Sequence, residues 1–238
     1  MEPITSLFLI KPNAPSVSRG FSLVETLVVL GIMLVIITVV MLGQAGFNKS
    51  LVLVDTSYTV AFTVRQAQAL GLSSKRIGTV QNAAHGVHIG TAPSTSYMLF
   101  ADTYPVAPGN SQGTKCVGHS VSSGPESRPG NCVYEGAPAG STDTIISTYT
   151  LNRGFKILSY CGVEKGTLIN KCSGSGSGLS ALDITFMRPN TQASIIGVSS
   201  GLPVELISAS IKVSTPDGAD TRCVNVTKVG QVSVAVCP

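Results

Sequence analysis

The amino-acid sequence predicts an α+β fold in which a long N-terminal helix precedes an antiparallel β-sheet domain. Residues 21–47 are almost entirely apolar, and residues 48–72 repeat apolar side chains at intervals of three and four. From residue 86 onward the chain changes to short runs rich in valine, isoleucine, threonine and aromatic residues, separated by turn residues. Runs of strands that follow a helix are typical of α+β domains and argue against βαβ units.

The first predicted element, residues 21–47, is a helix that can cross a membrane. At about 1.5 Å per residue it is roughly 40 Å long, and the hydrocarbon core of a bilayer is about 30 Å thick. Between Gly20 and Asn48 its one charge is Glu25. A carboxylate costs about 2.5–3.5 kcal/mol at the centre of a membrane helix, so Glu25 requires a partner or a function. The helix dipole favours it in the first turn, and cleavage after Gly20 would add a free amine on Phe21.

The charges before this run predict its orientation. Lys11 and Arg19 both precede the apolar residues, and such charges stay on the cytoplasmic side of a membrane helix. A secretory peptide has the reverse order, with a short apolar region before a small-residue cleavage site. We therefore expect four segments: a cytoplasmic leader at 1–20, the membrane helix at 21–47, an amphipathic helix at 48–72 and an extracytoplasmic β-rich domain at 73–238.

The amphipathic helix needs a surface on which to bury its apolar face. The members of that face are predicted from their three- and four-residue steps, and they are Val54, Tyr58, Ala61, Phe62, Ala69 and Leu72. The sheet formed by the later strands is expected to cover these side chains.

The β-rich part contains eight predicted strand segments. They lie at residues 87–89, 97–100, 144–151, 155–160, 182–187, 193–198, 204–213 and in a closing hairpin at 222–236. Residues 104–143, rich in proline, glycine, serine and asparagine, are predicted to form a long surface loop. Asp217 and Gly218 indicate a turn; a calcium loop there would need more oxygen ligands at regular spacing.

Six cysteines lie in the part expected outside the cytoplasm, where an oxidising compartment and an even count favour disulfides. Many connectivities are possible, and local pairing is the simplest expectation. The pairs would be Cys116 with Cys132, Cys161 with Cys172, and Cys223 with Cys237. The last pair follows from a hairpin turning near Gly230, which is expected to set 223 opposite 237. A metal site is the alternative, but the chain has no Cys-x-x-Cys spacing, and His85 and His88 stand three apart in a predicted strand.

Composition and motifs give no sign of an enzyme. Residues 173–178 alternate serine and glycine, but this repeat lacks the Gly-x-Ser-x-Gly spacing of a nucleophile elbow, which also needs a strand before it and a helix after it. The formal net charge is +4 for the whole chain and +3 without Lys11, Arg19 and Glu2, which is too mild to indicate nucleic-acid binding. We predict no catalytic residue, no cofactor and no metal ligand.

The segment Gly20-Phe21-Ser22-Leu23-Val24-Glu25 resembles the class III signal of type IV pilins and type II secretion pseudopilins. The resemblance implies that prepilin peptidase cuts after Gly20 and that the new N-terminus, Phe21, is methylated. In that family a glutamate stands fifth after the cut, which is the position of Glu25. The resemblance further implies that Glu25 pairs with the Phe21 amine of a neighbouring subunit during filament assembly.

Three further segments resemble the GspH/FimT class of minor pseudopilins. They are residues 64–69, 182–190 and 223–232. In that class a strand ends in Phe-x-Pro-x-Gly and a final hairpin ends in a glycine. Here Asn190 replaces the glycine, and Gln231 stands where an arginine often follows the hairpin glycine.

Together the resemblances imply a structural, minor subunit of a type IV pilus or a type II secretion pseudopilus. Its expected partners are prepilin peptidase, other subunits through the N-terminal helix, the inner-membrane assembly platform, and membrane lipid before assembly. It would cross the inner membrane once, with its head outside, and then enter an extracytoplasmic filament. The alternative is a binding module at a pilus tip for DNA, a secreted substrate or a surface. The basic residues that would serve it are Lys115, Arg128, Lys165 and Lys171.

Overall fold

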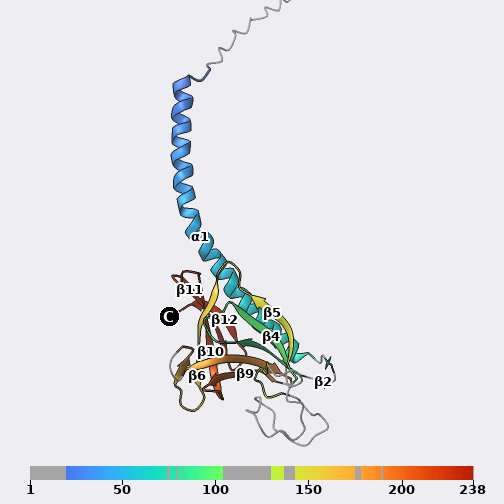
Figure 1. Ribbon diagram of the computed structural model, residues 1–238. Coiled ribbons are helices and arrows are strands. Elements are labelled where there is room, and N and C mark those ends of the chain that lie inside the picture. Colours follow the sequence, from blue (N-terminus) through green and yellow to red (C-terminus); the bar gives the residue numbers. More distant parts are fainter. Residues whose placement is uncertain are drawn as a thin grey trace, which may run out of the picture. The chain divides into compact units, whose positions relative to one another are not determined.

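The computed structural model describes residues 20–73, 76–78, 80–81, 83–103, 130–136, 143–174, 178–188 and 190–237. Its one long helix, α1 (Leu23–Leu72), precedes a curled antiparallel β-sheet domain, which confirms the α+β expectation (Figure 1). Contacts within the chain divide it between Gly46 and Phe47 into two units. The first unit contains the apolar part of α1, and the second contains the rest of α1 and all the strands of the described residues.

The strands follow α1 in an unbroken series. Their bounds are β1 (Arg76–Ile77), β2 (Val80–Gln81), β3 (Ala84–Ile89), β4 (Ser96–Asp102), β5 (Thr144–Thr150), β6 (Lys156–Glu164), β7 (Asn170–Cys172), β8 (Leu179–Met187), β9 (Asn190–Ser199), β10 (Leu202–Ser214), β11 (Thr221–Thr227) and β12 (Val232–Val236). Every predicted strand segment is found here. The sequence did not predict β1, β2 and β7, which are two or three residues long and too short for an alternating pattern to show.

The main sheet is antiparallel throughout and runs in the order β12-β11-β10-β9-β8-β3-β4-β5, with β6 and β7 joined to it through β10. The long strand β10 makes this branching possible. Its first residues, up to Leu206, pair with β9, and its later residues pair with β6 and β11. The strands β1 and β2 form a separate two-stranded sheet.

The sheet curls around the second part of α1, and two hydrogen bonds from adjacent helical residues show this. Arg65 donates to the backbone carbonyl of Val232 in β12 at 3.1 Å. Gln66 accepts a bond from the Tyr149 hydroxyl in β5, also at 3.1 Å. Because β12 and β5 are the two ends of the strand order, only a curled sheet brings both of them to the same helical turn.

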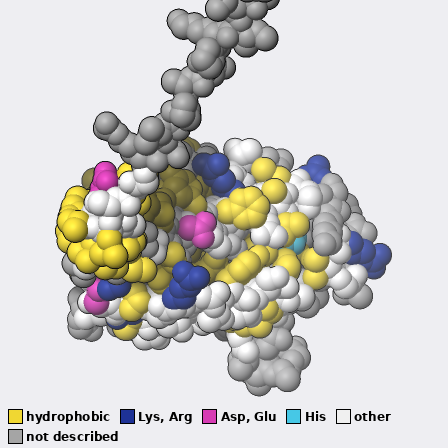
Figure 2. All heavy atoms as spheres, turned by 90° about the horizontal axis from the view of Figure 1, so that it is seen from above, with side chains coloured by type: hydrophobic (Ala, Val, Ile, Leu, Met, Phe, Trp, Pro, Cys, Tyr) yellow, Lys and Arg dark blue, Asp and Glu magenta, His cyan; other side chains and the backbone are white. Residues whose placement is uncertain are grey.

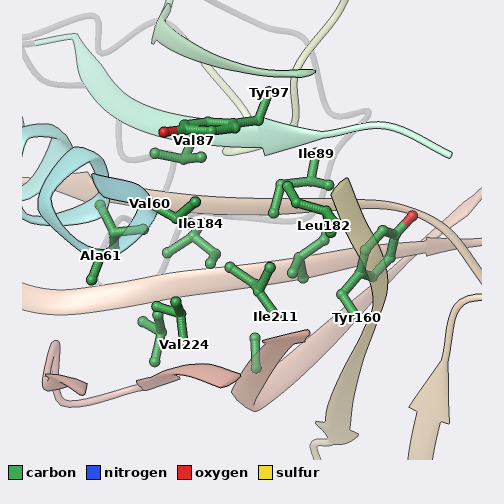
Figure 3. Packing of buried hydrophobic residues seen from close by; sticks show 14 of the residues in the cluster. Val60, Ala61, Val87, Ile89, Tyr97, Tyr160, Leu182, Ile184, Ile211 and Val224 are labelled. Carbon is green, nitrogen blue, oxygen red and sulfur yellow. The ribbon is translucent and has the colours of Figure 1, made fainter. Parts of the chain in front are cut away.

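The core lies between the helix and the concave face of the sheet. Val60, Val64 and Ala67 of α1 are fully buried. They pack in one cluster with aliphatic side chains from the central strands, including Val87, Ile89, Leu182, Ile184, Ile211 and Val224 (Figure 3). At the end of the helix a Cβ atom on Gly71 would overlap the backbone carbonyl of Phe186, so a side chain there would push the helix away from β8.

The face of α1 that packs on the sheet differs from the predicted one. The buried positions are Leu53, Ser57, Val60, Ala61, Thr63, Val64, Ala67 and Gly71, whereas Tyr58 and Phe62 are 58% and 67% exposed. Of the predicted face, Ala61 is the member that is fully buried. The prediction gave most weight to large apolar side chains, but the sheet approaches closely where the side chains are small.

The outer face of the sheet has a smaller core of its own. Asp183, Thr185 and Met187 alternate along β8 with the side chains that face the helix. Ala84, Met187 and Ile196 form a second apolar cluster with Cys132, and Val133 packs against it. Residues 130–136 therefore cover part of the outer face, which explains why β8 is buried on both sides.

Candidate functional site

The start of α1 carries the three residues expected to direct processing and assembly. Gly20 and Phe21 precede the helix, Phe21 is 82% exposed, and Glu25 lies in the first turn. Within the described part of the chain no atom lies within 4 Å of a Cβ placed on Gly20. Packing among the described residues therefore does not explain a glycine at position 20.

Ser22 caps the helix, which the sequence reasoning did not use. Its Oγ accepts a hydrogen bond from the Glu25 backbone N–H at 3.2 Å, and its carbonyl accepts one from the Thr26 N–H at 3.1 Å. The pattern Ser-x-x-Glu at positions 22–25 is the sequence signal of a capping box and could have been recognised. The cap residue lies two positions after Gly20 and the helix begins at Leu23, so a chain beginning at Phe21 would keep the cap.

The first part of α1 has the length and composition to cross a membrane. The candidate span is Leu23–Met41, 19 residues, and none of it is buried inside the chain. Side chains such as Leu27, Leu34 and Val39 are each more than 60% exposed. Exposed apolar surface on this scale indicates a lipid or protein environment around this segment.

The second part of α1 also carries an uncovered apolar stripe, which we call the outer stripe. It comprises Phe47, Leu51, Tyr58 and Phe62, all more than half exposed. Spacings of four and seven residues place them on one side of the helix, opposite the buried positions Leu53, Val60 and Val64. The second unit thus covers one side of the helix with its own sheet and leaves large apolar side chains on the other.

Two of the three expected disulfides join described residues. Cys161 and Cys172 face each other directly in the β6–β7 pair and are bonded, and Cys223 is bonded to Cys237. The register expected for the second pair was wrong, because Cys223 lies opposite Ala235 and reaches Cys237 diagonally, just beyond β12. Cys132 is also disulfide-bonded, but its expected partner, Cys116, lies outside the described residues.

Of the four basic residues considered for DNA binding, two form ion pairs and two lie outside the described residues. Lys165 forms an ion pair with Glu205 at 2.8 Å, and Lys171 forms one with Glu164 at 3.1 Å. Lys115 and Arg128 lie outside the described residues. On the face seen in Figure 2, lysine and arginine side chains lie in separate places among uncharged and hydrophobic ones. Paired, scattered cations of this kind do not form the continuous basic surface that nucleic-acid binding favours.

The turn at Asp217 uses its carboxylate locally. Asp217 accepts hydrogen bonds from the Thr215 hydroxyl and the Ala219 backbone N–H, and it forms an ion pair with Lys49 of α1 at 3.1 Å. The Thr215 hydroxyl and the Lys49 ammonium lower the pKa of this exposed carboxyl group. The predicted turn is confirmed, and these contacts account for both carboxylate oxygens.

A group of three acidic residues, which the sequence did not single out, meets at the outer face of the sheet. Asp102 ends β4, Asp143 immediately precedes β5, and Glu135 belongs to the segment 130–136. One carboxylate oxygen from each lies within 4.8 Å of the other two. We call Asp102, Glu135 and Asp143 the carboxylate cluster.

Backbone N–H groups hold the cluster in place. The Cys132 N–H donates to Asp102 Oδ2 at 2.6 Å, and the Thr103 and Glu135 N–H groups donate to Asp143 at 2.8 and 2.9 Å. Gly130 has a φ of 109°, and a Cβ atom there would overlap the Asp102 carboxylate. A glycine is therefore needed at position 130 for both backbone conformation and space.

Burial and the nearby Asp143 charge raise the pKa values of Asp102 and Glu135. Burial raises the pKa of Asp102 well above its usual range, and the Asp143 charge raises it further, against the opposing effect of the Cys132 N–H. Burial also raises the pKa of Glu135 to about 8; a hydrogen bond from Asn131 opposes this shift and the Asp143 charge adds to it. Both groups therefore resist ionisation unless positive charge or protons offset the repulsion.

A hydrogen-bonded histidine–aspartate pair lies beside the cluster. His88 donates from Nδ1 to Asp183 Oδ1 at 2.7 Å, and Asp183 is fully buried. The Tyr134 ring packs on His88 and Phe100, with ring centroids 4.5 and 5.3 Å apart. Burial raises the pKa of Asp183, and the bond from His88 opposes that shift. Tyr134 and His88 thus form an aromatic cover over this part of the outer face.

Comparison with known proteins gives one match. Residues 15–41 match the family model described as the prokaryotic N-terminal methylation motif. No curated protein and no solved structure matches the chain. The matched residues include Gly20, Phe21, Glu25 and the exposed apolar part of α1, so the motif supports a type IV pilin-like subunit that prepilin peptidase processes.

Proposed function

We propose that this protein is a structural, minor subunit of a type IV pilus or a type II secretion pseudopilus. Prepilin peptidase cuts the leader, residues 1–20, from the chain, and the new terminus at Phe21 is methylated. The helical segment 21–47 holds the subunit in the inner membrane with residues 73–238 outside. Assembly through an inner-membrane platform then transfers the helix from lipid to a filament of similar subunits.

The observation that carries this proposal is the match of residues 15–41 to the methylation motif, with Glu25 as its one charge after Gly20. An isolated carboxylate in an apolar helix is costly, and an N-terminal ammonium on a neighbouring subunit would offset that cost. The helix dipole at the Ser22 cap stabilises the same carboxylate only in part. Pairing between subunits would thus explain why a carboxylate stands at position 25 of an otherwise apolar helix.

The outer stripe is a second, independent observation that supports assembly with other subunits. Phe47, Leu51, Tyr58 and Phe62 continue the apolar character of α1 beyond the membrane segment. Surface that is apolar and uncovered in the single chain is suited to burial against another subunit. The resemblance to GspH/FimT proteins supports a minor role, and the paired lysines Lys165 and Lys171 give no specific support to a DNA-binding tip module.

Processing provides the test. The chain is co-expressed with prepilin peptidase, and the membrane fraction is examined for loss of a leader of about 20 residues. We expect cleavage of the wild type and none of Gly20→Asp, because the peptidase must accommodate the residue before the cut. Asn13→Asp, which adds the same charge earlier in the leader, is the control and should be cut normally. Cleavage of Gly20→Asp to the mature size would refute the proposal.

A further inference from the structure

The main sheet ends in two strands that carry no charge. They are β5 at one end of the strand order and β12 at the other, and among the described residues each is paired on one side only. Neither strand contains an acidic, basic or proline residue. Edge strands of natural proteins usually carry such residues, because an unpaired strand edge is a template for pairing with another chain. Two edges without this protection need an explanation beyond the fold of the single chain.

The free backbone groups of β5 lie at alternate residues. The Leu151 N–H donates to the Thr95 carbonyl at 2.7 Å, and bonded pairs in an antiparallel ladder recur at every second residue. Thr148 and Thr150 therefore direct their N–H and C=O groups away from β4. A register shift nearer the start of β5 confines the regular part of this edge to residues 147–150.

The β12 edge has a matching pattern. The Thr227 N–H donates to the Gln231 carbonyl at 3.0 Å, so Val234 and Val236 direct their backbone groups away from β11. Within the described chain these groups bond to no residue beyond β11. Each edge thus offers two residues with outward donors and acceptors, which is enough for a short antiparallel ladder.

The two edges flank the outer stripe of α1. Arg65 bonds to β12 and Gln66 bonds to β5. Successive residues of a helix are about 100° apart, which places Tyr58 and Phe62 between these two contacts on the circumference of the helix. The sheet therefore stops on either side of the stripe. Among the described residues, both strand edges and the stripe are uncovered on one continuous side of the second unit.

The directions of the two end strands favour a second copy of this chain as the partner. Each pairing along the strand order is antiparallel, and the order makes β5 and β12 run in opposite directions along the sheet. Lys11 and Arg19 give every copy in a membrane the same orientation. Between two such copies, β5 of one and β12 of the other are antiparallel, whereas two β5 strands are parallel. Antiparallel pairing is the more stable of the two and continues the pattern of the sheet.

We propose that β5 of one subunit pairs with β12 of a second copy, so that the main sheets of adjacent subunits become continuous. The backbone groups of Thr148 and Thr150 then bond to those of Val234 and Val236 in the second copy. The contact is heterologous and leaves one free edge on each side of the pair, as a growing filament requires. It rests on the proposed filament function, which gives all copies one orientation, and it adds a specific contact between their β-rich domains.

The test is a cross-link between two full-length copies that carry different tags and are co-expressed in one membrane with prepilin peptidase. One copy carries Thr148→Cys and the other Ser233→Cys, both at exposed positions. They neighbour Tyr149 and Val234, which pack on the core, so both lie on the outer face of the sheet. Within the described residues every cysteine is in a disulfide, so the new thiols react with a short bismaleimide. The chain without new cysteines gives the background.

We expect a cross-linked dimer that bears both tags. Its yield should exceed that of Thr148→Cys with itself by about tenfold, because the parallel pair lacks the matching ladder. Thr150→Lys, added to the Thr148→Cys copy, places an ammonium on the edge and should lower the yield by about tenfold. Ser180→Lys adds the same charge at an exposed position of β8, inside the sheet, and should leave the yield unchanged. Both lysine variants should keep the Tm within about 2 °C, since both positions are exposed.

Three results would overturn the proposal. An equal yield from Thr148→Cys with Thr167→Cys, at an exposed turn, would show that the copies meet by chance. A stronger cross-link between two Thr148→Cys copies would show pairing of β5 with β5. An unchanged yield in Thr150→Lys would show that the edge is not the contact. Should Thr150→Lys unfold, the comparison of cysteine pairs decides alone.

The same membranes separate this contact from the proposed function. Loss of the leader is measured by immunoblotting in each sample before cross-linking. Normal leader cleavage without the cross-link refutes the contact between β5 and β12 alone. An uncut wild-type chain refutes the proposed function whether or not the cross-link forms.

Discussion

The two parts of helix α1 use the same kinds of residue for opposite purposes. In Leu23–Met41, valine, leucine and isoleucine side chains are exposed over the whole segment. After Phe47, similar side chains at Leu53, Val60 and Val64 are buried against a sheet that the chain itself supplies. Apolar content alone therefore does not determine whether a helical segment packs within its own chain or requires lipid or another subunit. The determining factor is whether the chain itself supplies a surface that covers the segment.

Different residues of α1 are consequently expected to contribute to the stability of the fold and to assembly. Burial of aliphatic side chains in the second unit stabilises the folded chain, by roughly 1.5–3 kcal/mol for each fully buried side chain. The exposed side chains of the first unit make no such contribution within the single chain. Substitutions in the two parts should thus separate assembly from folding.

The largest effect is expected from Glu25→Ala, which should impair assembly and spare folding. Removing one partner of a buried ion pair leaves the other uncompensated, at a cost of about 3–5 kcal/mol. Incorporation into filaments, measured by immunoblotting sheared filament fractions, should fall by about two orders of magnitude or more. Leader cleavage and the Tm of the chain should stay unchanged. Normal incorporation of Glu25→Ala would contradict the pairing role.

A buried aliphatic side chain in the second unit should show the reverse behaviour. Ile184 in β8 is fully buried, and Ile184→Ala should lower the free energy of unfolding by about 2–5 kcal/mol. The matched substitution in the first unit is Leu34→Ala, at a position 66% exposed, and it should change this free energy by less than about 0.5 kcal/mol. Urea unfolding in detergent, followed by near-ultraviolet circular dichroism, compares the two. Equal losses would remove the distinction between the units.

Substitution in the outer stripe should give the smallest effect. It should leave the stability of the fold unchanged and weaken incorporation into filaments. Phe62→Ser should leave the free energy of unfolding within about 0.5 kcal/mol of the wild type, because the ring is 67% exposed in the folded chain. If another subunit buries that ring, incorporation should weaken by about 1.5–3 kcal/mol per contact. Thr59→Ser, at an exposed polar position of the same helix, is the control. A Phe62→Ser variant that unfolds easily but assembles normally would show that the stripe serves the head.

Much of the fold could be predicted because its signals are local. Alternating and β-branched runs indicated the long strands, and turn residues such as Asp217-Gly218 separated them. The pairing of Cys161 with Cys172 also followed from short separation along the chain. The signal for the helix start is equally local, because Ser22 and Glu25 have the Ser-x-x-Glu spacing of a capping box, yet the charge of Glu25 alone does not indicate the Ser22 cap.

What could not be predicted depends on which surfaces meet in space. The buried face of α1 is set by close approach of the sheet, which selects Ala67 and Gly71 over the larger Tyr58 and Phe62. Asp102 and Asp143 come together because β4 and β5 are neighbours, and Glu135 joins them from the intervening loop. No spacing along the sequence indicates this convergence, so the carboxylate cluster could be found only in three dimensions.

The most direct test of the proposed subunit role is mass spectrometry of the N-terminus of the protein isolated from its native membrane. We predict a chain that begins at Phe21 and carries one methyl group on its α-amine, which leaves that amine positively charged for pairing with Glu25. A chain that retains Met1, or begins at any residue other than Phe21, would contradict it.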